Sequence, residues 1–227
     1  MKIQLYISVI LAIALSSCNS KSAKQADKEP VKERIGIYVE PYYNSNPFKI
    51  NVGSYSEALK TNDEKKILEV AKTIKSNIDK VDLMTMYVLS TRLYDLNKKD
   101  EAVYWFYTAS FRRNVFKQTV LDNEHGTEAG ELTQALDAFK QLLGEFVNGY
   151  ALGQIDKNIE IIKAVVADNS NMKSLSTVYP TLKFDEAKLP EAIKNAVKDR
   201  EDFIKYMNDN RAEIKAKRTE NGIDGNY

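Results

Sequence analysis

Cysteine and histidine are nearly absent from this chain of 227 residues, which contains one of each, Cys18 and His125. A single cysteine cannot form an internal disulfide, and a zinc site takes three or four ligands. Carboxylates flank the histidine in the segment Glu124–Glu128, but we interpret this segment as a solvated loop. The sequence therefore predicts no disulfide framework, no metal site and no bound cofactor.

Glycine and proline are also scarce, with 9 and 5 residues respectively. Long stretches contain neither, which favours helices over a turn-rich β-sandwich. Charged residues make up 29% and hydrophobic residues 43% of the chain, as is ordinary for a soluble globular domain. The composition thus predicts a folded, mainly α-helical domain.

An excess of positive charge is missing too, because 33 basic side chains are balanced by 32 acidic ones. Proteins that bind nucleic acid usually carry a basic patch and a clear positive excess, so we expect no nucleic-acid partner. The sequence also lacks a glycine-rich nucleotide-binding loop and a Gly-x-Ser-x-Gly nucleophile elbow. Known catalytic motifs therefore give no lead to the function.

Residues 1–17 have the features of a cleavable signal peptide. Lys2 precedes an apolar run from Leu5 to Leu15, which two serines follow. A helix of this length rises only about 16 Å, against about 30 Å of hydrocarbon in a bilayer, so a membrane-spanning helix is not expected. A charged start, a short apolar run and small residues at its end together predict cleavage after residue 17.

The stretch Leu15-Ser16-Ser17-Cys18 resembles the lipobox of bacterial lipoproteins, with Ser17 where alanine or glycine is usual. The resemblance implies lipid transfer to the Cys18 sulfur, cleavage before Cys18 and acylation (palmitate) of the new amino terminus. Each buried methylene contributes about 0.8 kcal/mol, so several acyl chains hold a protein firmly on a bilayer. We therefore expect a cell-envelope protein whose partner is the lipid bilayer, through lipidated Cys18.

A polar segment follows this cysteine. Residues 19–34 contain one large aliphatic residue, Val31, among many lysine, serine and glutamate residues, which is typical of a disordered tether. Lys21 and Lys24 make its start basic, whereas an acidic patch there would favour the cell exterior. We expect the domain to face the periplasm, anchored to the inner membrane or to the inner leaflet of the outer membrane.

The helical domain is predicted over residues 35–217, with a frayed tail at residues 218–227. We expect a short strand from Ile35 to Val39 and then an extended, aromatic-rich arm that reaches Tyr55. Helical periodicity then predicts about six helices, near residues 62–78, 82–96, 100–116, 132–152, 156–168 and 190–215. Their expected N-caps include Asn62 or Asp63, Asp82 and Asp100. Asn97-Lys98-Lys99 is expected to form a short turn in which Asn97 tolerates a left-handed backbone, and residues 169–188 are expected to be irregular.

The segment from Tyr87 to Ala109 resembles one tetratricopeptide repeat, a pair of packed antiparallel helices. The matching positions are Leu89, Ser90, Ala102, Phe106 and Ala109. A second pair, residues 142–166, has Asn158 in place of the packing alanine, and arrays of this repeat normally have three or more units. The resemblance implies one helical hairpin (TPR-like) and, by analogy alone, an interaction surface.

Aromatic and arginine side chains on this hairpin are the candidate binding residues. Trp105 and Tyr107 either line an aromatic groove for a peptide or glycan or, as their helical spacing favours, belong to a buried core. Arg92, Arg112 and Arg113 either form an anion-binding patch or make ion pairs with nearby acidic side chains. Those acidic residues are Asp95, Asp100 and Glu101.

Two functions are compatible with these features. The first is a non-catalytic lipoprotein whose helical domain binds an envelope protein, with an immunity or inhibitor role as one form of this. The second is an envelope hydrolase that acts on cell-wall or glycan material through paired carboxylates. Carboxyl groups about 5–10 Å apart in a cleft would favour the hydrolase, and a surface without them would favour the binding module.

Overall fold

A computed structural model describes residues 52–224, and this part of the chain confirms the mainly α prediction. It contains eight α-helices, joined by short 3-10 helices at Gly53–Tyr55, Ile78–Lys80, Leu175–Thr177 and Glu186–Lys188. The α-helices are α1 (Ser56–Lys60), α2 (Glu64–Ser76), α3 (Leu83–Asp95), α4 (Lys99–Thr119), α5 (Glu128–Ala151), α6 (Ile155–Asn169), α7 (Leu189–Asp209) and α8 (Arg211–Glu220).

Several sequence predictions concern residues outside this range. The signal peptide, the lipidated cysteine, the tether, the strand at residues 35–39 and most of the aromatic arm lie outside the described residues. The last three residues of the arm, Gly53–Tyr55, form a 3-10 helix instead of extended chain. Within residues 52–224, no helix combines the length and the apolar character needed to cross a membrane.

Helix starts follow the predicted caps at two positions and depart from them at a third. The carboxylates of Asp63 and Asp82 accept hydrogen bonds from backbone amides in the first turns of α2 and α3. Asp100, however, is not an N-cap, because α4 already begins at Lys99. The turn explains this: Asn97 takes the predicted left-handed backbone (φ 61°), and the Lys98 amide donates to the Leu93 carbonyl at 2.8 Å. The chain therefore re-enters a helix without room for a capping residue.

The α3–α4 pair forms the predicted helical hairpin, and its contact is the most extensive between helices in the described residues. Ala102 and Ala109 of α4 are fully buried, as the repeat resemblance implies for close packing. The Ser90 hydroxyl on α3 donates to the Ala102 carbonyl at 2.6 Å, which requires the two helices to approach closely.

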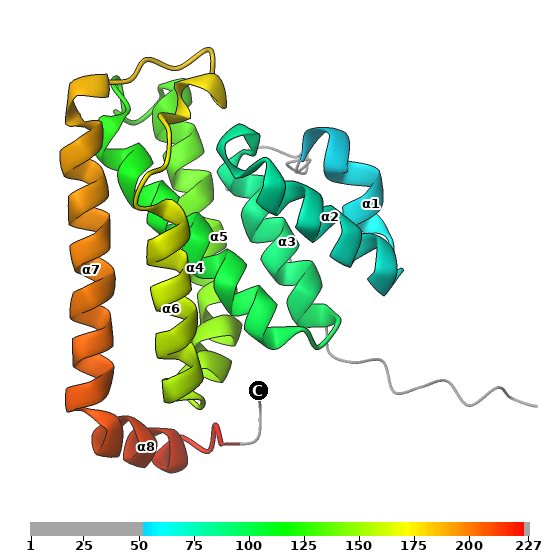
Figure 1. Ribbon diagram of the computed structural model, residues 1–227, viewed down its shortest axis with the longest axis vertical. Helices are drawn as coiled ribbons and strands as arrows, with labels where there is room; N and C mark the ends of the chain where they lie inside the picture. Colours follow the sequence, from blue (N-terminus) through cyan, green and yellow to red (C-terminus); the bar gives the residue numbers. More distant parts are fainter. Residues whose placement is uncertain (1–51, 225–227) are drawn as a thin grey trace, which may run out of the picture. The chain divides into compact units, whose positions relative to one another are not determined.

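Helix α4 is the centre of the domain. Figure 1 shows α3, α5, α6 and α7 arranged around it, and each of them packs against it. A helix with neighbours on all sides must be apolar around its circumference. This explains the run of aromatic residues in α4, whose fully or nearly fully buried members are Trp105, Phe106, Tyr107, Phe111 and Phe116.

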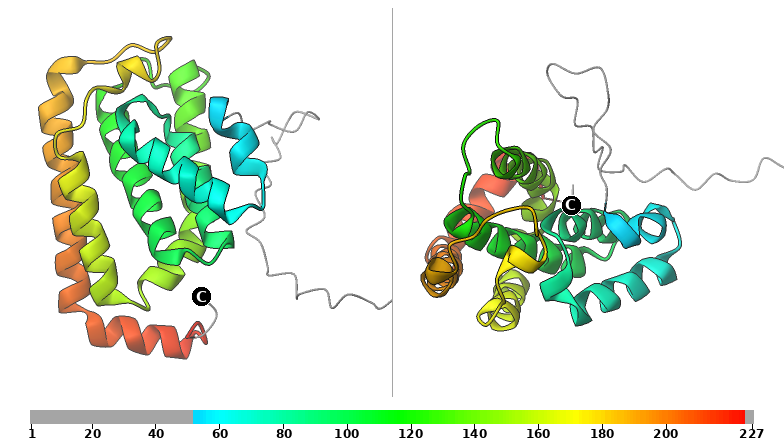
Figure 2. Two further views of the ribbon diagram at one scale, coloured as in Figure 1. Left: turned by 45° about the vertical axis from the view of Figure 1, so that its right-hand side comes forward. Right: turned by 90° about the horizontal axis from the view of Figure 1, so that it is seen from above.

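A long connection between α6 and α7 covers the carboxyl end of α4, as the views in Figure 2 show. It pairs with the chain that leaves α4 through an isolated antiparallel bridge between Val120 and Phe184. The rings of Tyr179 and Phe184 both meet Phe116 edge-on, with centroids 5.4 and 5.7 Å apart. The irregular stretch predicted around residues 169–188 is thus a packed part of the core.

The carboxyl-terminal helix predicted as one element is two. The chain bends at Asn210, whose side-chain amide donates to the Tyr206 carbonyl at 2.8 Å and thereby competes with the helical backbone. Helix α8 then continues to Glu220, so residues 218–220 are helical and the prediction that the tail frays from residue 218 is wrong for them. Arg218 is buried there and donates to the Gly149 carbonyl at the end of α5, at 2.5 Å.

The hairpin contact leads to the first prediction. Ala102→Leu should lower the free energy of unfolding by about 1–3 kcal/mol, because the α3–α4 contact has no space for a larger side chain. The control is Lys163→Leu on the exposed surface of α6, which should change it by no more than about 0.5 kcal/mol. Denaturant melts of both variants measure this. A neutral Ala102→Leu would contradict the close packing of the hairpin.

Candidate functional site

The three arginines expected to form an anion-binding patch do not converge. Arg92 pairs with Asp95, one turn along α3, at 2.9 Å, and this is the predicted ion pair that the structure contains. Its second terminal nitrogen donates to the Thr61 carbonyl at 2.8 Å and so connects α3 to the chain between α1 and α2. Arg92 therefore holds neighbouring segments together and does not form part of a patch with Arg112 and Arg113.

Arg112 lies inside the protein, where its side chain is 1% exposed. Its guanidinium donates to the Asn169 side chain at 2.6 Å, to the Ile78 carbonyl at 3.2 Å and to the Asp79 carboxylate at 2.8 Å. Burial lowers the pKa of Arg112, and the Asp79 carboxylate opposes that change. The residue thus joins α4 to the end of α6 and to the 3-10 helix before α3.

Arg113 points to another side of α4 and pairs with Asp137 of α5. Lys117, one turn further along α4, pairs with the same carboxylate at 3.3 Å. The predicted partners Asp100 and Glu101 pair with neither Arg112 nor Arg113, because the observed acidic partners are brought in from other elements. The observed partners, Asp79 and Asp137, are more than 20 residues away from the arginines in the sequence, so the sequence did not indicate these pairs.

Trp105 and Tyr107 belong to the core and form no open aromatic groove. Both side chains are only 3% exposed, in agreement with the alternative that their helical spacing favoured. The Tyr107 hydroxyl donates to the side chain of Asn148 on α5 at 2.9 Å. Burial raises the pKa of Tyr107 to about 12.

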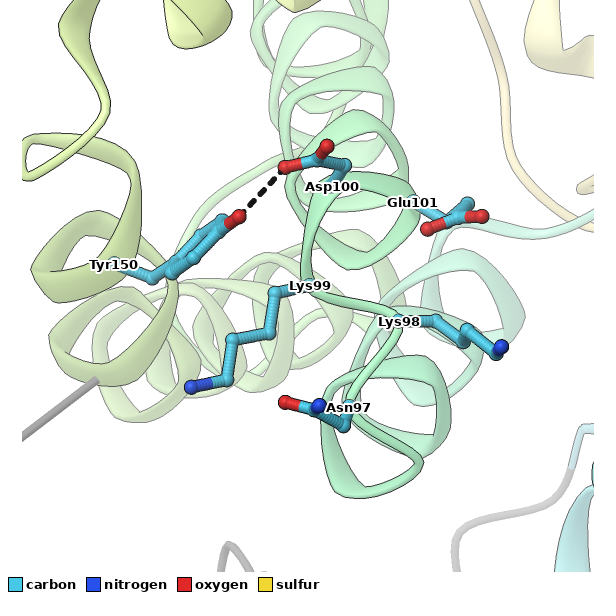
Figure 3. A pocket seen from close by; sticks show the side chains of 6 residues that line it. All are labelled: Asn97, Lys98, Lys99, Asp100, Glu101 and Tyr150. Carbon is cyan, nitrogen blue, oxygen red and sulfur yellow. Dashed lines mark hydrogen bonds between the residues drawn. The ribbon is translucent and has the colours of Figure 1, made fainter.

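A shallow, open pocket of about 290 Å³ lies at the turn of the α3–α4 hairpin, next to the end of α5. Figure 3 shows its side chains, which are polar or charged, with lysines and carboxylates together. They are Asn97, Lys98, Lys99, Asp100, Glu101 and Tyr150. The sequence predicts a turn at residues 97–99 but does not indicate that Tyr150 lies beside it.

The side chains of this pocket are held by contacts on both sides. The Tyr150 hydroxyl donates to the Asp100 carboxylate at 2.8 Å. Burial and, to a smaller extent, this hydrogen bond raise the pKa of Tyr150 to about 12. The Lys99 ammonium lies 5.3 Å from the Tyr94 ring centroid and 5.4 Å from that of Tyr150. Lys98 pairs with Glu64 of α2 at 2.8 Å. Charged groups are thus presented in fixed positions at the surface.

The loop that contains the single histidine is solvent-exposed, in agreement with its interpretation as a solvated loop. Glu124, His125 and Gly126 are all exposed between α4 and α5. In residues 52–224, no three His, Cys, Asp or Glu side chains are grouped so that they could hold a metal ion.

The fold and the pocket define an all-α domain with a charged surface site at a helical hairpin. The chain belongs to the same family as an uncharacterised protein of Haemophilus influenzae, to which it is 31% identical over 206 residues. The match covers 84% of this chain and 72% of the relative. No protein-family profile matches the chain, and no solved structure matches it.

The buried position of Arg112 leads to the second prediction. Arg112→Ala should lower the free energy of unfolding by about 3–5 kcal/mol, because it leaves the fully buried Asn169 oxygen without its donor and the half-buried Asp79 carboxylate without its partner. Arg211→Ala is a matched control: Arg211 pairs with Asp156 at a similar distance, 2.7 Å, but on the surface.

The control should lose less than about 1 kcal/mol, as surface ion pairs do. Urea melts of both variants provide the comparison. Equal losses in the two variants would show that burial adds nothing to the Arg112 interaction.

Proposed function

We propose that this protein is a lipid-anchored protein of the bacterial cell envelope whose helical domain is a non-catalytic module that binds another protein. The observation that carries the anchor is the stretch Leu15-Ser16-Ser17-Cys18, which begins at the last residue of an apolar run. The basic start of the tether, with Lys21 and Lys24, supports a domain that faces the periplasm.

The pocket at the hairpin turn supports the binding part of this proposal. Its Lys99 ammonium lies beside two tyrosine rings, and one of these rings is fixed in turn by Asp100. Side chains that are ordered before binding lose less conformational entropy on association than free ones. Tyrosine is also enriched at the centres of protein interfaces. A partner with complementary charges would find donors and acceptors already in place.

The arrangement of the carboxylates favours binding over hydrolysis. Asp100 and Glu101 are consecutive in the first turn of α4, and Figure 3 shows them directed to different sides of the helix. One oxygen of Asp100 already accepts the Tyr150 hydroxyl. Glycosidases place two carboxyl groups on opposite sides of a substrate bond, about 5–10 Å apart. The pocket does not have this arrangement.

Metabolic labelling with a fatty-acid analogue tests the anchor. Wild-type protein should take up the label, and Cys18→Ser should abolish it, because the only thiol in the chain is then lost. Ser17→Ala is the control, since it restores the residue usual in a lipobox and should keep the label. Equal labelling of the wild type and Cys18→Ser would overturn the lipoprotein proposal.

Photo-crosslinking in the intact envelope tests the binding surface. A photoreactive residue at Glu101, an exposed position that lines the pocket, should form a discrete adduct with another protein, and the additional substitution Lys99→Glu should reduce it. The same residue at the exposed position Lys163 on α6 is the control and should not form this adduct. Identical adducts from both positions, insensitive to Lys99→Glu, would contradict a binding site at the hairpin turn.

A further inference from the structure

A second group of charged side chains lies on the opposite half of α4, where α5 and α7 both pack against this helix. Arg113 and Lys117 come from α4, Lys140 from α5 and Arg200 from α7. Polar contacts connect α4 to each of the other two helices here. Asp137 of α5 pairs with Arg113 and Lys117, and Asp199 of α7 accepts from Asn114 of α4 at 3.1 Å. These cations come from three separate parts of the sequence, which is why the sequence analysis identified only Arg113.

The group has more positive charge than its own carboxylates neutralise. It contains four cationic side chains and two carboxylates, those of Asp137 and Asp199. Within the described part of the chain, the ammonium of Lys140 and the guanidinium of Arg200 form no salt bridge, and Asp199 is the carboxylate that attracts both. Two positive charges are therefore left over in a place where water is partly excluded.

Both arginines also have unused hydrogen-bonding capacity. The Nε atoms of Arg113 and Arg200 are buried and have no hydrogen-bond partner in residues 52–224. The Arg113 side chain is 9% exposed, so its guanidinium is held inside the structure instead of moving freely in water. A buried donor without a partner costs about 1–3 kcal/mol, and nearly all such donors in native proteins are satisfied. An acceptor that supplies these bonds would stabilise the arrangement.

The aromatic core positions one of these cations. The Arg200 guanidinium lies 5.5 Å from the centroid of the Tyr107 ring, which is itself fixed by its hydrogen bond to Asn148. Stacking on an aromatic ring leaves the edge of a guanidinium free, and this edge carries its hydrogen-bond donors.

Helix geometry places these cations near one another, because Lys140 lies one turn after Asp137 on α5 and Arg200 directly follows Asp199 on α7. Burial lowers the pKa of Lys140, and Arg113, Arg200 and Lys117 lower it further in that order, whereas Asp199 opposes them. Burial likewise lowers the pKa values of Arg113 and Arg200. Repulsion among cations held together in this way is relieved when an anion binds between them.

We propose that Arg113, Lys140 and Arg200 form a binding site for a phosphate group at the α4–α5–α7 junction. A phosphate monoester carries a charge of about −1.5 to −2 at pH 7, which matches the two uncompensated positive charges, whereas a single carboxylate would neutralise one of them. Guanidinium groups bind phosphate oxygens through two parallel hydrogen bonds, and the lysine supplies a further charge. This site is separate from the hairpin pocket and from Cys18.

Isothermal titration of the full-length chain carrying Cys18→Ala tests this site without the lipid anchor, so its outcome is independent of the anchoring proposal. Inorganic phosphate at constant ionic strength should bind, and acetate should bind more weakly. Arg200→Gln and Lys140→Gln should each weaken phosphate binding about tenfold or more, which is the effect of one charged hydrogen bond. Lys163→Gln, on the exposed surface of α6, is the control and should bind like the parent chain.

Two further probes identify the source of the phosphate group. Binding of glycerol 3-phosphate would assign the site to a soluble phosphate ester. Binding only of vesicles that contain phosphatidic acid, whose headgroup is also a phosphate monoester, would assign it to a lipid headgroup. Circular dichroism confirms that each variant is folded. Failure of all three phosphate probes to bind would overturn the proposal, as would acetate binding equal to phosphate binding. Unchanged affinity in both the Arg200 and the Lys140 variants would also overturn it.

Discussion

The buried guanidinium of Arg112 is the interaction on which the arrangement of the helices depends. A charge removed from water is costly unless hydrogen bonds and an opposite charge replace its hydration. Here the replacement comes from two segments at once: Ile78 and Asp79 in the 3-10 helix before α3, and Asn169 at the end of α6. One side chain of α4 therefore connects this helix both to the end of α6 and to the segment before α3. The apolar surface of α4 supplies the driving force for packing, and Arg112 selects one packing arrangement.

Local features of the fold could be predicted from the sequence because they depend on neighbouring residues. Asp63 and Asp82 cap helices through amides three residues away, and Asn97 takes a left-handed turn that few other residues tolerate. The small residues Ala102 and Ala109 marked the close side of the hairpin for the same reason.

The features that could not be predicted depend on residues distant in the sequence. Nothing near Arg112 or Arg113 indicates that their partners are Asp79 and Asp137, since the sequence shows acidic residues close by that are not used. Asn158 gives a similar lesson. It replaces the small residue expected in a second repeat, and it is nevertheless buried, with its amide 3.3 Å from the Met207 sulfur of α7. Because α7 packs against Asn158 from outside the helix pair, this position accommodates a polar side chain where a second repeat would require a small residue.

The two charged sites lie at different ends of α4, and this follows from the way the helix is covered. Its first turn stands at the hairpin turn, where Lys99 and Asp100 reach the surface pocket. Its later turns are enclosed, so Arg113 lies among side chains from α5 and α7. The same helix therefore supplies charged groups to an open pocket and to a group in which Arg113 is buried and Lys140 and Arg200 are half-buried, and the two differ in how much water surrounds their charges.

The central position of α4 also has a consequence for biosynthesis. Its partner residues are made late: Asn169 follows Arg112 by 57 positions, and Asp199 follows Asn114 by 85. At translation rates of about 5–20 residues per second, α7 emerges roughly 4–17 s after the helix it covers. During that interval the aromatic face of α4 has no complete cover. The nascent chain thus exposes the apolar face of a partly folded hairpin for seconds, and only the completed chain can cover it.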